Sequence, residues 1–331
     1  MHAGQLRQRV PGGIGRYVRH LLDHLPEVGV DPVPFSGGRL TYQSWQWIRR
    51  PRVRAEGDLV HAPSLAVPAP GRRPLVVTVH DLVFERFPEY LTPHGVRFHR
   101  RGLAVTSREA AAVVAPSAFV RDELLEHGMS PDRVFVAHHG VAPPPPLDGV
   151  TPGAAGPPFA LFVGTVEPRK GLDTLLDAVA ALRASGHPEL TLVVAGAHGW
   201  GDLPDLQQPW VDWRRDVDDR TLDALYAQAV ALALPSRYEG FGLPVVEAMA
   251  HGCPVVTSTA ACLPEIAGDA GLLVPPDDVD ALAGALAALL DDEPARAALA
   301  ARGRERADRF TWRASAEAHR TAYEHATGTG G

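Results

Sequence analysis

One stretch, residues 229–250, constrains the fold of this chain more than any other. It opens with an apolar run, Ala229–Leu234, which has the composition of a buried parallel strand. Gly240 and Gly242 follow, and glycine permits backbone angles that other residues avoid. Pro244 then indicates a helix start, because proline is tolerated in the first helical turn. The stretch predicts a strand, a glycine loop and a helix N-terminus, whose N–H groups and positive dipole end favour an anion.

Two carboxylates flank this predicted anion site. Glu239 precedes the glycine loop, and Glu247 lies in the first turns of the predicted helix. A carboxylate beside a phosphate is best explained by sugar hydroxyls, because it accepts their hydrogen bonds. The arrangement is therefore typical of a nucleotide-sugar site. The alternative is an ordinary βα turn in a Rossmann-like sheet, with Glu247 serving only as a helix-start carboxylate.

The run Glu239–Ala250, EGFGLPVVEAMA, resembles the signature of two glutamates separated by seven residues in retaining GT-B glycosyltransferases, and more narrowly their large family four. The similarity continues through Gly252–Val256, Leu263–Ile266 and Gly271–Pro276. It implies an α/β fold of the GT-B type, with two Rossmann-like βα domains that face each other across a cleft. It also implies a hexosyltransferase that moves a mannose- or glucose-type sugar from a nucleotide diphosphate sugar to a glycan, lipid-linked or small-molecule acceptor, with retention of the anomeric configuration.

The length of 331 residues suits two domains, each able to bury its own core. Prolines and glycines between residues 143 and 158 indicate a linker. We expect an acceptor-side domain, a linker, a nucleotide-sugar domain and a C-terminal helix that returns to the first domain, at residues 1–145, 146–158, 159–308 and 309–327. Residues 1–10 are polar and contain no apolar strand, so either the first strand of the N-terminal domain is missing or the start of the chain is placed too late.

A second strand, loop and helix are predicted between Phe159 and Ser185, and this loop contains the adjacent cations Arg169 and Lys170. Lys170 is the single lysine in a chain with 31 arginines, which makes it a candidate for a role that requires a compact ammonium. A diphosphate leaving group gains negative charge as the glycosidic bond breaks, and fixed cations stabilise that charge. Lys170 is the first candidate catalytic cation and Arg169 the second. The alternative is two solvated charges that end a turn.

The resemblance implies that Glu247 binds the ribose hydroxyls and that Glu239 binds a hydroxyl of the donor sugar. The loop Gly164–Gly171 is similar to that of a mannosyltransferase-like subgroup, although many family members have arginine where this chain has Thr165. The implied catalytic residues are Glu239, Lys170, Arg169 and His80. The implied donor-binding residues are Glu247, Gly240, Phe241, Gly242, Leu243, Val217, Gly13 and Gly164.

Three of these positions lie outside the two loops. His80 follows the apolar run Leu75–Val79, and the family places a histidine here beside the donor sugar. A polar pair that merely ends the strand is the alternative. Gly13 belongs to a glycine turn before an amphipathic helix, which in the family lies near the sugar phosphate and acceptor; a simple helix start is the alternative. The backbone near Val217 resembles the strand end that contacts the nucleobase.

We expect neither a metal nor another cofactor, because cations and a helix terminus can stabilise the diphosphate. The run Asp216–Asp219 is similar to the DxD metal motif of another glycosyltransferase fold, but Asp218 or Asp219 is better placed as a helix N-cap. His138 and His139 would point to opposite faces of an extended chain. The two cysteines match no metal-ligand pattern.

Charge is distributed unevenly along the chain. Residues 1–150 contain 18 arginines and 14 acidic residues, whereas residues 151–331 contain 14 basic and 25 acidic residues. A basic first half suggests an anionic partner or an anionic membrane surface, and a solvated arginine-rich face is the alternative. Nucleic acid is not expected at a net charge of −7. Neither a membrane-spanning run nor a signal peptide is recognisable, so we expect a cytoplasmic protein, with peripheral contact at the inner face of the membrane as an option.

Two rival functions remain open, and a third is disfavoured. A nucleotide-sugar 2-epimerase shares the architecture, and a sugar product in a new compound would separate the two enzymes. A non-catalytic two-domain sugar-binding protein would bind free sugar without nucleotide. A dinucleotide dehydrogenase is disfavoured, because no GxGxxG follows a predicted strand with an acidic residue about 20 positions later.

Overall fold

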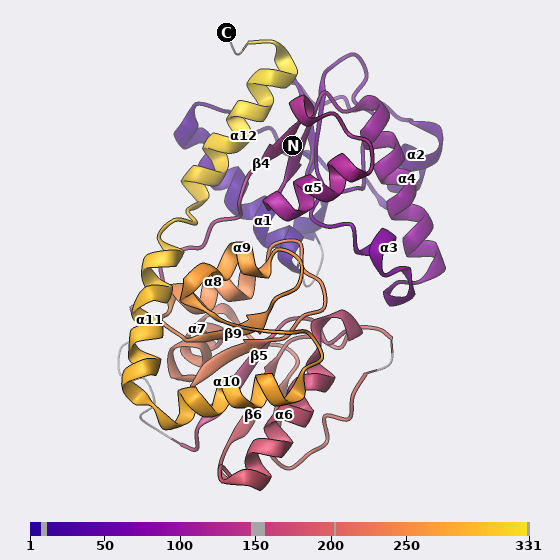
Figure 1. Cartoon of the computed structure of the whole chain (residues 1–331). Helices are drawn as coiled ribbons and strands as arrows, with labels where there is room; N and C mark the ends of the chain where they lie inside the picture. The colour runs from indigo at the N-terminus through magenta and orange to yellow at the C-terminus, as the bar shows by residue number, and fades with distance from the viewer. Residues whose placement is uncertain (8–11, 147–155, 202, 330–331) are drawn as a thin grey trace. The chain divides into compact units, whose positions relative to one another are not determined.

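The computed structural model describes residues 1–7, 12–146, 156–201 and 203–329. The predicted linker 146–158 therefore lies almost entirely outside the described residues. The chain divides into two compact units, which are Met1–Gly140 together with the segment from Thr311, and Val141–Phe310. Each unit is built on a parallel sheet with helices against it (Figure 1), as the α/β prediction requires.

Unit 1 contains a four-stranded parallel sheet in the order β1-β2-β3-β4. Its strands are short and apolar, and nearly all of their residues are buried, as is usual for parallel strands covered on both faces. The strands are β1 (Val60–Ala62), β2 (Leu75–Thr78), β3 (Ala112–Ala115) and β4 (Val134–Val136).

Alternate residues of these strands face different helices. Val76 belongs to a core cluster with residues of α1 (Gly12–His24) and α12 (Trp312–Thr327). Val77 belongs to a second cluster with residues of α4 (Pro93–Glu109) and α5 (Ala118–Glu126). The remaining helices of unit 1 are α2 (Arg39–Ile48), α3 (Val83–Arg86) and the 3-10 helices η1 (Gly4–Arg7), η2 (Leu25–Val28), η3 (Pro88–Tyr90) and η4 (Pro131–Arg133).

The described part of unit 1 has no strand before β1, but its first residues extend along that strand. The amide of His2 donates to the carbonyl of His61 at 2.9 Å, and the amide of Ala3 donates to Phe35 at 2.7 Å. Met1 accepts from the amide of Phe35 at 3.0 Å. One hydrogen bond therefore joins the first residues to β1, and an isolated bridge pairs His2 with Phe35.

The helix α12 follows unit 2 in sequence and packs within unit 1. It buries Trp312 and Tyr323 in the core cluster that contains α1. The hydroxyl of Tyr323 lies 2.9 Å from Nδ1 of His61, and Nε2 of His319 lies 2.7 Å from the hydroxyl of Tyr17. Apolar packing and buried hydrogen bonds together attach this C-terminal helix to the sheet of unit 1.

Unit 2 contains a six-stranded parallel sheet in the order β10-β9-β8-β5-β6-β7. The first strand in sequence, β5, lies between β8 and β6, so the direction of winding reverses at β5 and β8. Open parallel sheets bind ligands at the carboxyl ends of strands where this reversal occurs. The strands are β5 (Phe159–Val163), β6 (Thr191–Ala195), β7 (Val211–Arg214), β8 (Ala231–Leu234), β9 (Val255–Ser258) and β10 (Leu272–Val274).

Side chains cap the N-termini of α5 and α7 (Asp219–Gln228), and the second of these caps was predicted. The side chain of Ser117 accepts from the amide of Val120 at the start of α5, and Asp218 accepts from the amide of Thr221 at 2.7 Å. The second cap confirms the N-cap predicted at Asp218 or Asp219. The helices of unit 2 are η5 (Pro168–Lys170), α6 (Leu172–Ser185), α7 (Asp219–Gln228), α8 (Leu243–Ala250), α9 (Leu263–Ala267), η6 (Gly268–Ala270), α10 (Val279–Asp291) and α11 (Glu293–Ala307).

Candidate active site

The two loops predicted to bind the donor meet at the carboxyl ends of β5 and β8. The loop after β5 ends at Gly171, which has a φ of 67°, and a Cβ at this position would lie 2.3 Å from the carbonyl oxygen of Pro235. The loops are also tied by the amide of Arg237, which donates to the carbonyl of Arg169 at 2.7 Å. Glycine at position 171 therefore permits the close approach of two loops that are distant in sequence.

Glu239 lies at the centre of this contact and is 5% exposed. The ammonium of Lys170 donates to its Oε1 atom, which also accepts from the Ser236 hydroxyl at 3.0 Å. The guanidinium of Arg169 donates to Oε2 at 3.1 Å and contacts Glu167 at 2.7 Å. The structure thus brings three predicted catalytic residues together, and it adds Glu167 and Ser236, which were not predicted.

The charges of this cluster are nearly balanced. Burial of the Glu239 carboxyl opposes its ionisation, but Lys170 and Arg169 outweigh burial and lower its pKa to about 2. Glu239 is therefore ionised at neutral pH. Two cations face two carboxylates, so an incoming diphosphate would compete with Glu167 and Glu239 for cations that are already fixed in place.

Arg237 is a further residue that was not predicted. Its guanidinium contacts Asp173 at 2.7 Å, donates to Asp277 at 2.7 Å, and donates to the carbonyl of Pro168 in the cation loop. Burial opposes the charge of Arg237, but the two aspartates outweigh burial and raise the pKa of the guanidinium above its usual value. Arg237 thus connects the glycine loop to the loop that contains Lys170.

The glycine loop leads into α8, as predicted. Gly242 precedes the helix with a φ of 83°, in the left-handed region that favours glycine. A Cβ at Gly242 would lie 3.0 Å from Cδ2 of Leu263. Gly240 and Phe241 are buried, and the Phe241 ring lies 5.8 Å from that of Phe310. The α8 N-terminus, including Leu243, therefore has the shape expected of an anion site.

Glu247 lies on α8 and is half-buried. Its Oε2 atom accepts from the hydroxyl of Tyr226 on α7 at 3.0 Å. Nδ1 of His251 lies 2.8 Å from the Glu247 carbonyl, and its Nε2 lies 2.9 Å from Asp223. Tyr226 was not predicted, and its hydrogen bond fixes the orientation of the Glu247 carboxylate.

Two further predicted residues of unit 2 are Gly164 and Val217. Gly164 follows β5, and a Cβ at this position would lie 3.5 Å from Cε of Lys170. Val217 lies three residues beyond the end of β7 and is partly exposed. The structure therefore brings Gly164 to the cation cluster and leaves Val217 in the connection from β7 to α7.

In unit 1, His80 follows β2 and is enclosed by aromatic side chains. Its Nε2 atom lies 2.9 Å from the carbonyl oxygen of Pro63, and burial lowers its pKa. The ring centroids of Tyr17 and His139 lie 4.9 and 5.3 Å from that of His80. Gly13 lies in the first turn of α1, the helix that contains Tyr17. These side chains gather near the ends of β2 and β4, and a neutral His80 suits hydrogen bonding.

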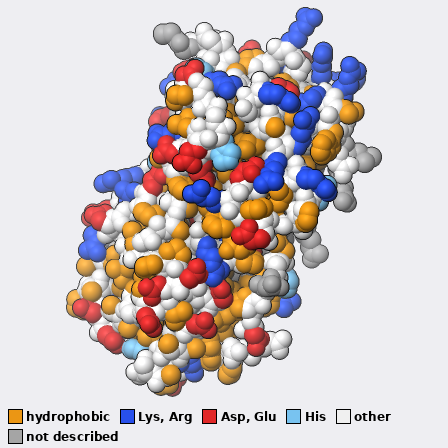
Figure 2. Space-filling view, turned by 45° about the vertical axis from the view of Figure 1, so that its right-hand side comes forward, with side chains coloured by type: hydrophobic (Ala, Val, Ile, Leu, Met, Phe, Trp, Pro, Cys, Tyr) orange, Lys and Arg blue, Asp and Glu red, His pale blue; other side chains and the backbone are white. Residues whose placement is uncertain are grey.

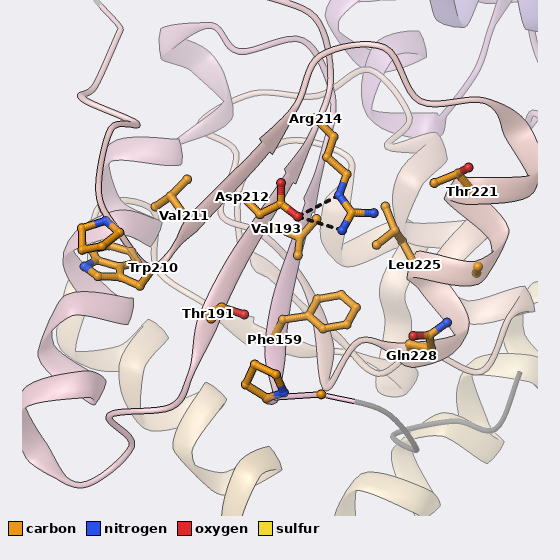
Figure 3. Close-up of a pocket in the computed structure, with 14 residues that line it drawn as sticks. Phe159, Thr191, Val193, Trp210, Val211, Asp212, Arg214, Thr221, Leu225 and Gln228 are labelled. Atoms are coloured by element: carbon orange, nitrogen blue, oxygen red, sulfur yellow. Dashed lines mark hydrogen bonds and ion pairs between the residues drawn. The ribbon is translucent and has the colours of Figure 1, made fainter.

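One cavity, of about 380 Å³, is not formed by the predicted residues. It lies between the β5–β7 side of the sheet and α7 (Figure 3), where Asp212 and Arg214 form an ion pair at 2.7 Å. Phe159 and Thr191 line it from the first residues of their strands, whereas the cation cluster lies beyond the last residues. A smaller cavity of about 230 Å³ borders Glu167. The smaller cavity is the one that adjoins the cation loop.

The described residues include no cluster of three or more His, Cys, Asp or Glu side chains that could hold a metal ion. Both cysteines, Cys253 and Cys262, are buried and unbridged. In the part of the chain that the structure covers, no helix combines the length and apolar character needed to cross a membrane.

Family comparisons match both halves of the chain. A model described as "Glycosyl transferases group 1" matches residues 157–292, and one described as "Glycosyltransferase Family 4" matches residues 32–143. The chain is 34% identical over 270 residues to the O-antigen chain mannosyltransferase B of Escherichia coli, covering 77% of this chain and 71% of that protein. It is 29% identical to the phosphatidyl-myo-inositol mannosyltransferase of Mycolicibacterium smegmatis, covering 97% and 92%.

Solved structures support the same fold. The Anabaena protein HepE, crystallised with UDP-glucose, superposes with a TM-score of 0.72 at 20% identity, covering 95% of this chain and 96% of that one. A sucrose-phosphate synthase from Thermosynechococcus elongatus superposes with a TM-score of 0.64 at 22% identity, covering 96% and 79%. With two parallel-sheet domains of the GT-B type and matches along both halves, the chain belongs to family four of the group 1 glycosyltransferases.

Proposed function

We propose that the chain transfers a hexosyl group, of mannose or glucose type, from a nucleotide diphosphate sugar to a glycan, lipid-linked or small-molecule acceptor, with retention of the anomeric configuration. The observation that carries this proposal is the contact of Lys170 and Arg169 with Glu239, beside the N-terminus of α8. Fixed cations and a helix N-terminus at one place suit a leaving diphosphate.

Each residue of the cluster has a role in this proposal. Lys170 and Arg169 exchange carboxylate contacts for diphosphate oxygens, and the amides of Gly240–Leu243 face the same charge. Glu239, released from the cations, accepts a hydrogen bond from a hydroxyl of the donor sugar. Glu247, oriented by Tyr226, accepts from the ribose hydroxyls. The reaction then proceeds without a metal ion.

Four positions have more peripheral roles. Neutral His80 lines the sugar side, and the turn at Gly13 lies near the acceptor. Backbone near Val217 contacts the nucleobase, and Gly164 leaves room beside the Lys170 stem. The named mannosyltransferase relatives and the mannosyltransferase-like loop favour a mannosyl donor. We place the enzyme in the cytoplasm, in peripheral contact with the inner face of the membrane.

Thermal unfolding with UDP-, GDP- and ADP-sugars in EDTA tests donor binding. One nucleotide should raise the melting temperature of the wild type, and the rise should shrink in Lys170→Ala but persist in Arg302→Ala, which removes an exposed cation of α11. Absence of a rise with every nucleotide would contradict the proposal.

Product analysis then separates the enzyme classes. Transfer predicts the sugar in a new compound with the anomeric configuration of the donor. A sugar epimerised at C2, either still on the nucleotide or released from it by water, would instead establish the 2-epimerase. Tight binding of free sugar with no turnover would establish a binding protein.

A further inference from the structure

A surface of unit 1 combines exposed apolar side chains with arginines. Trp47 and Ile48, at the end of α2, are 58% and 66% exposed. Arg50, Arg52 and Arg54 follow directly and are also exposed. Large apolar side chains are usually buried, so an adjacent exposed pair suggests that something covers it.

Helix α4 adds a second row of arginines beside this pair. Arg97, Arg101, Ala104 and Arg108 follow the spacing of a single helix face. α4 packs against α2, and the Arg101 guanidinium lies 5.7 Å from the centroid of the Trp47 ring. The surface formed in this way is called the α2–α4 patch, and it consists of Trp47, Ile48, Arg50, Arg52, Arg54, Arg97, Arg101 and Arg108.

The α2–α4 patch contains more positive charges than there are negative charges on the acidic groups near it. Glu109 is bound by Arg49 at 2.7 Å, so this pair contributes little net charge. Glu56 and Asp58 are exposed and follow the patch in sequence, but the patch contains six arginines against these two carboxylates. Figure 2 shows Lys and Arg side chains gathered in the upper part of the view, where unit 1 lies.

We propose that the α2–α4 patch binds the surface of a membrane that contains anionic lipids. Tryptophan favours the headgroup region, and the transfer of an exposed isoleucine out of water is favourable. Arginines near the surface are attracted by anionic headgroups. A nucleic acid would use the arginines but would offer Ile48 no apolar environment, so the apolar pair favours lipid. The patch thereby gives the proposed peripheral contact a defined surface, and it does not involve the donor site.

Vesicle co-sedimentation of the full chain tests this proposal without donor or acceptor. The wild type should bind vesicles of phosphatidylcholine with phosphatidylglycerol, bind pure phosphatidylcholine weakly, and dissociate as salt is raised. The triple variant R50S/R52S/R54S should bind the anionic vesicles about a hundredfold more weakly, since each arginine contributes roughly a factor of five. The double variant W47S/I48S should lose at least about tenfold at low salt.

Matched controls make the outcome decisive. The triple variant R302S/R309S/R313S removes the same number of exposed arginines elsewhere, and V33S removes another exposed apolar side chain of unit 1. Both should bind vesicles as the wild type does, and all variants should keep the wild-type melting temperature and nucleotide-dependent rise. Three results would overturn the proposal: no preference of the wild type for anionic vesicles, an equal loss in the controls, or RNA binding that requires the arginines but not Trp47 and Ile48.

Discussion

The buried pair of Lys170 and Glu239 permits a quantitative test through substitution. Lys170→Met keeps an apolar stem of similar length but leaves the Glu239 carboxylate, which is 5% exposed, with one cation instead of two. Breaking one side of a buried ion pair costs about 3–5 kcal/mol, and the remaining contact with Arg169 places our expectation near 3 kcal/mol. Glu239→Gln should cost a similar amount, because it leaves the buried ammonium of Lys170 without its partner carboxylate.

The double variant Lys170→Met/Glu239→Gln removes both charges and should be less destabilised than the sum of the single variants. Urea unfolding at neutral pH, followed by circular dichroism, should give a coupling of at least about 1.5 kcal/mol in the double-mutant cycle. The exposed pair Arg313–Glu317 on α12 supplies the control cycle, and its coupling should stay below about 0.5 kcal/mol. Additivity within about 0.5 kcal/mol at Lys170 and Glu239 would refute the reasoning.

The dependence of stability on pH tests the same pair independently. The pKa of Glu239 is lowered in the folded chain from 4.5 to about 2, so the unfolded chain binds the proton more readily. The stabilisation is therefore complete above about pH 4.5 and is lost as the pH falls towards 2, with a total of roughly 3 kcal/mol. This acid-dependent loss should be smaller in Lys170→Met. An unchanged loss would contradict the assignment of the lowered pKa to Lys170.

Three further substitutions have definite expected results. Arg237→Ala should lower kcat/KM for the donor at least about tenfold, because the cation loop loses its contact with the glycine loop. Arg237→Lys should restore only part of the lost kcat/KM, and steady-state rates equal to wild type in Arg237→Ala would contradict this expectation. Tyr226→Phe should raise the Kd of the nucleotide about fivefold in calorimetry, which is the effect of one hydrogen bond. An unchanged Kd would contradict the proposal that Glu247 binds the donor. Gly242→Ala should destabilise the chain by about 1–2 kcal/mol in thermal unfolding, because φ is 83° at this position. An unchanged melting temperature would contradict the expected backbone strain of alanine at this φ.

Apolar runs and caps allowed much of the fold to be predicted from the sequence. The strand begins at Phe159 and the helix ends at Ser185 as predicted, because each apolar segment is bounded by residues that end regular structure. The bounds of the strand Val211–Arg214 were not predicted, and the resemblance indicated only a strand end near Val217. Only one of its sides pairs, with β6, and its alternating partly buried and exposed residues lack the continuous apolar run of an interior strand.

The residues of the candidate site were more predictable than their contacts. Motif and spacing indicated Lys170 and Glu239, but their contact spans 69 positions and depends on how closely two loops approach. The two loops can approach because Gly171 has no side chain, which would otherwise collide with the carbonyl oxygen of Pro235. A local sequence pattern does not show that Gly171 and Pro235 are neighbours. Tyr226 lies on a helix with no distinguishing motif, and Arg237 precedes the run Glu239–Ala250 that carries the resemblance, so only the three-dimensional structure relates their contacts to the site.

The central claim is that Lys170 stabilises a diphosphate leaving group without a metal ion. The most direct measurement is the rate of nucleoside diphosphate release from the sugar nucleotide in EDTA, for the wild type, Lys170→Met and the exposed-cation control Arg302→Met. The account predicts full wild-type turnover in EDTA, a fall of about a hundredfold to a thousandfold in Lys170→Met, and no fall in the control. Turnover that EDTA abolishes, or that Lys170→Met retains, would contradict it.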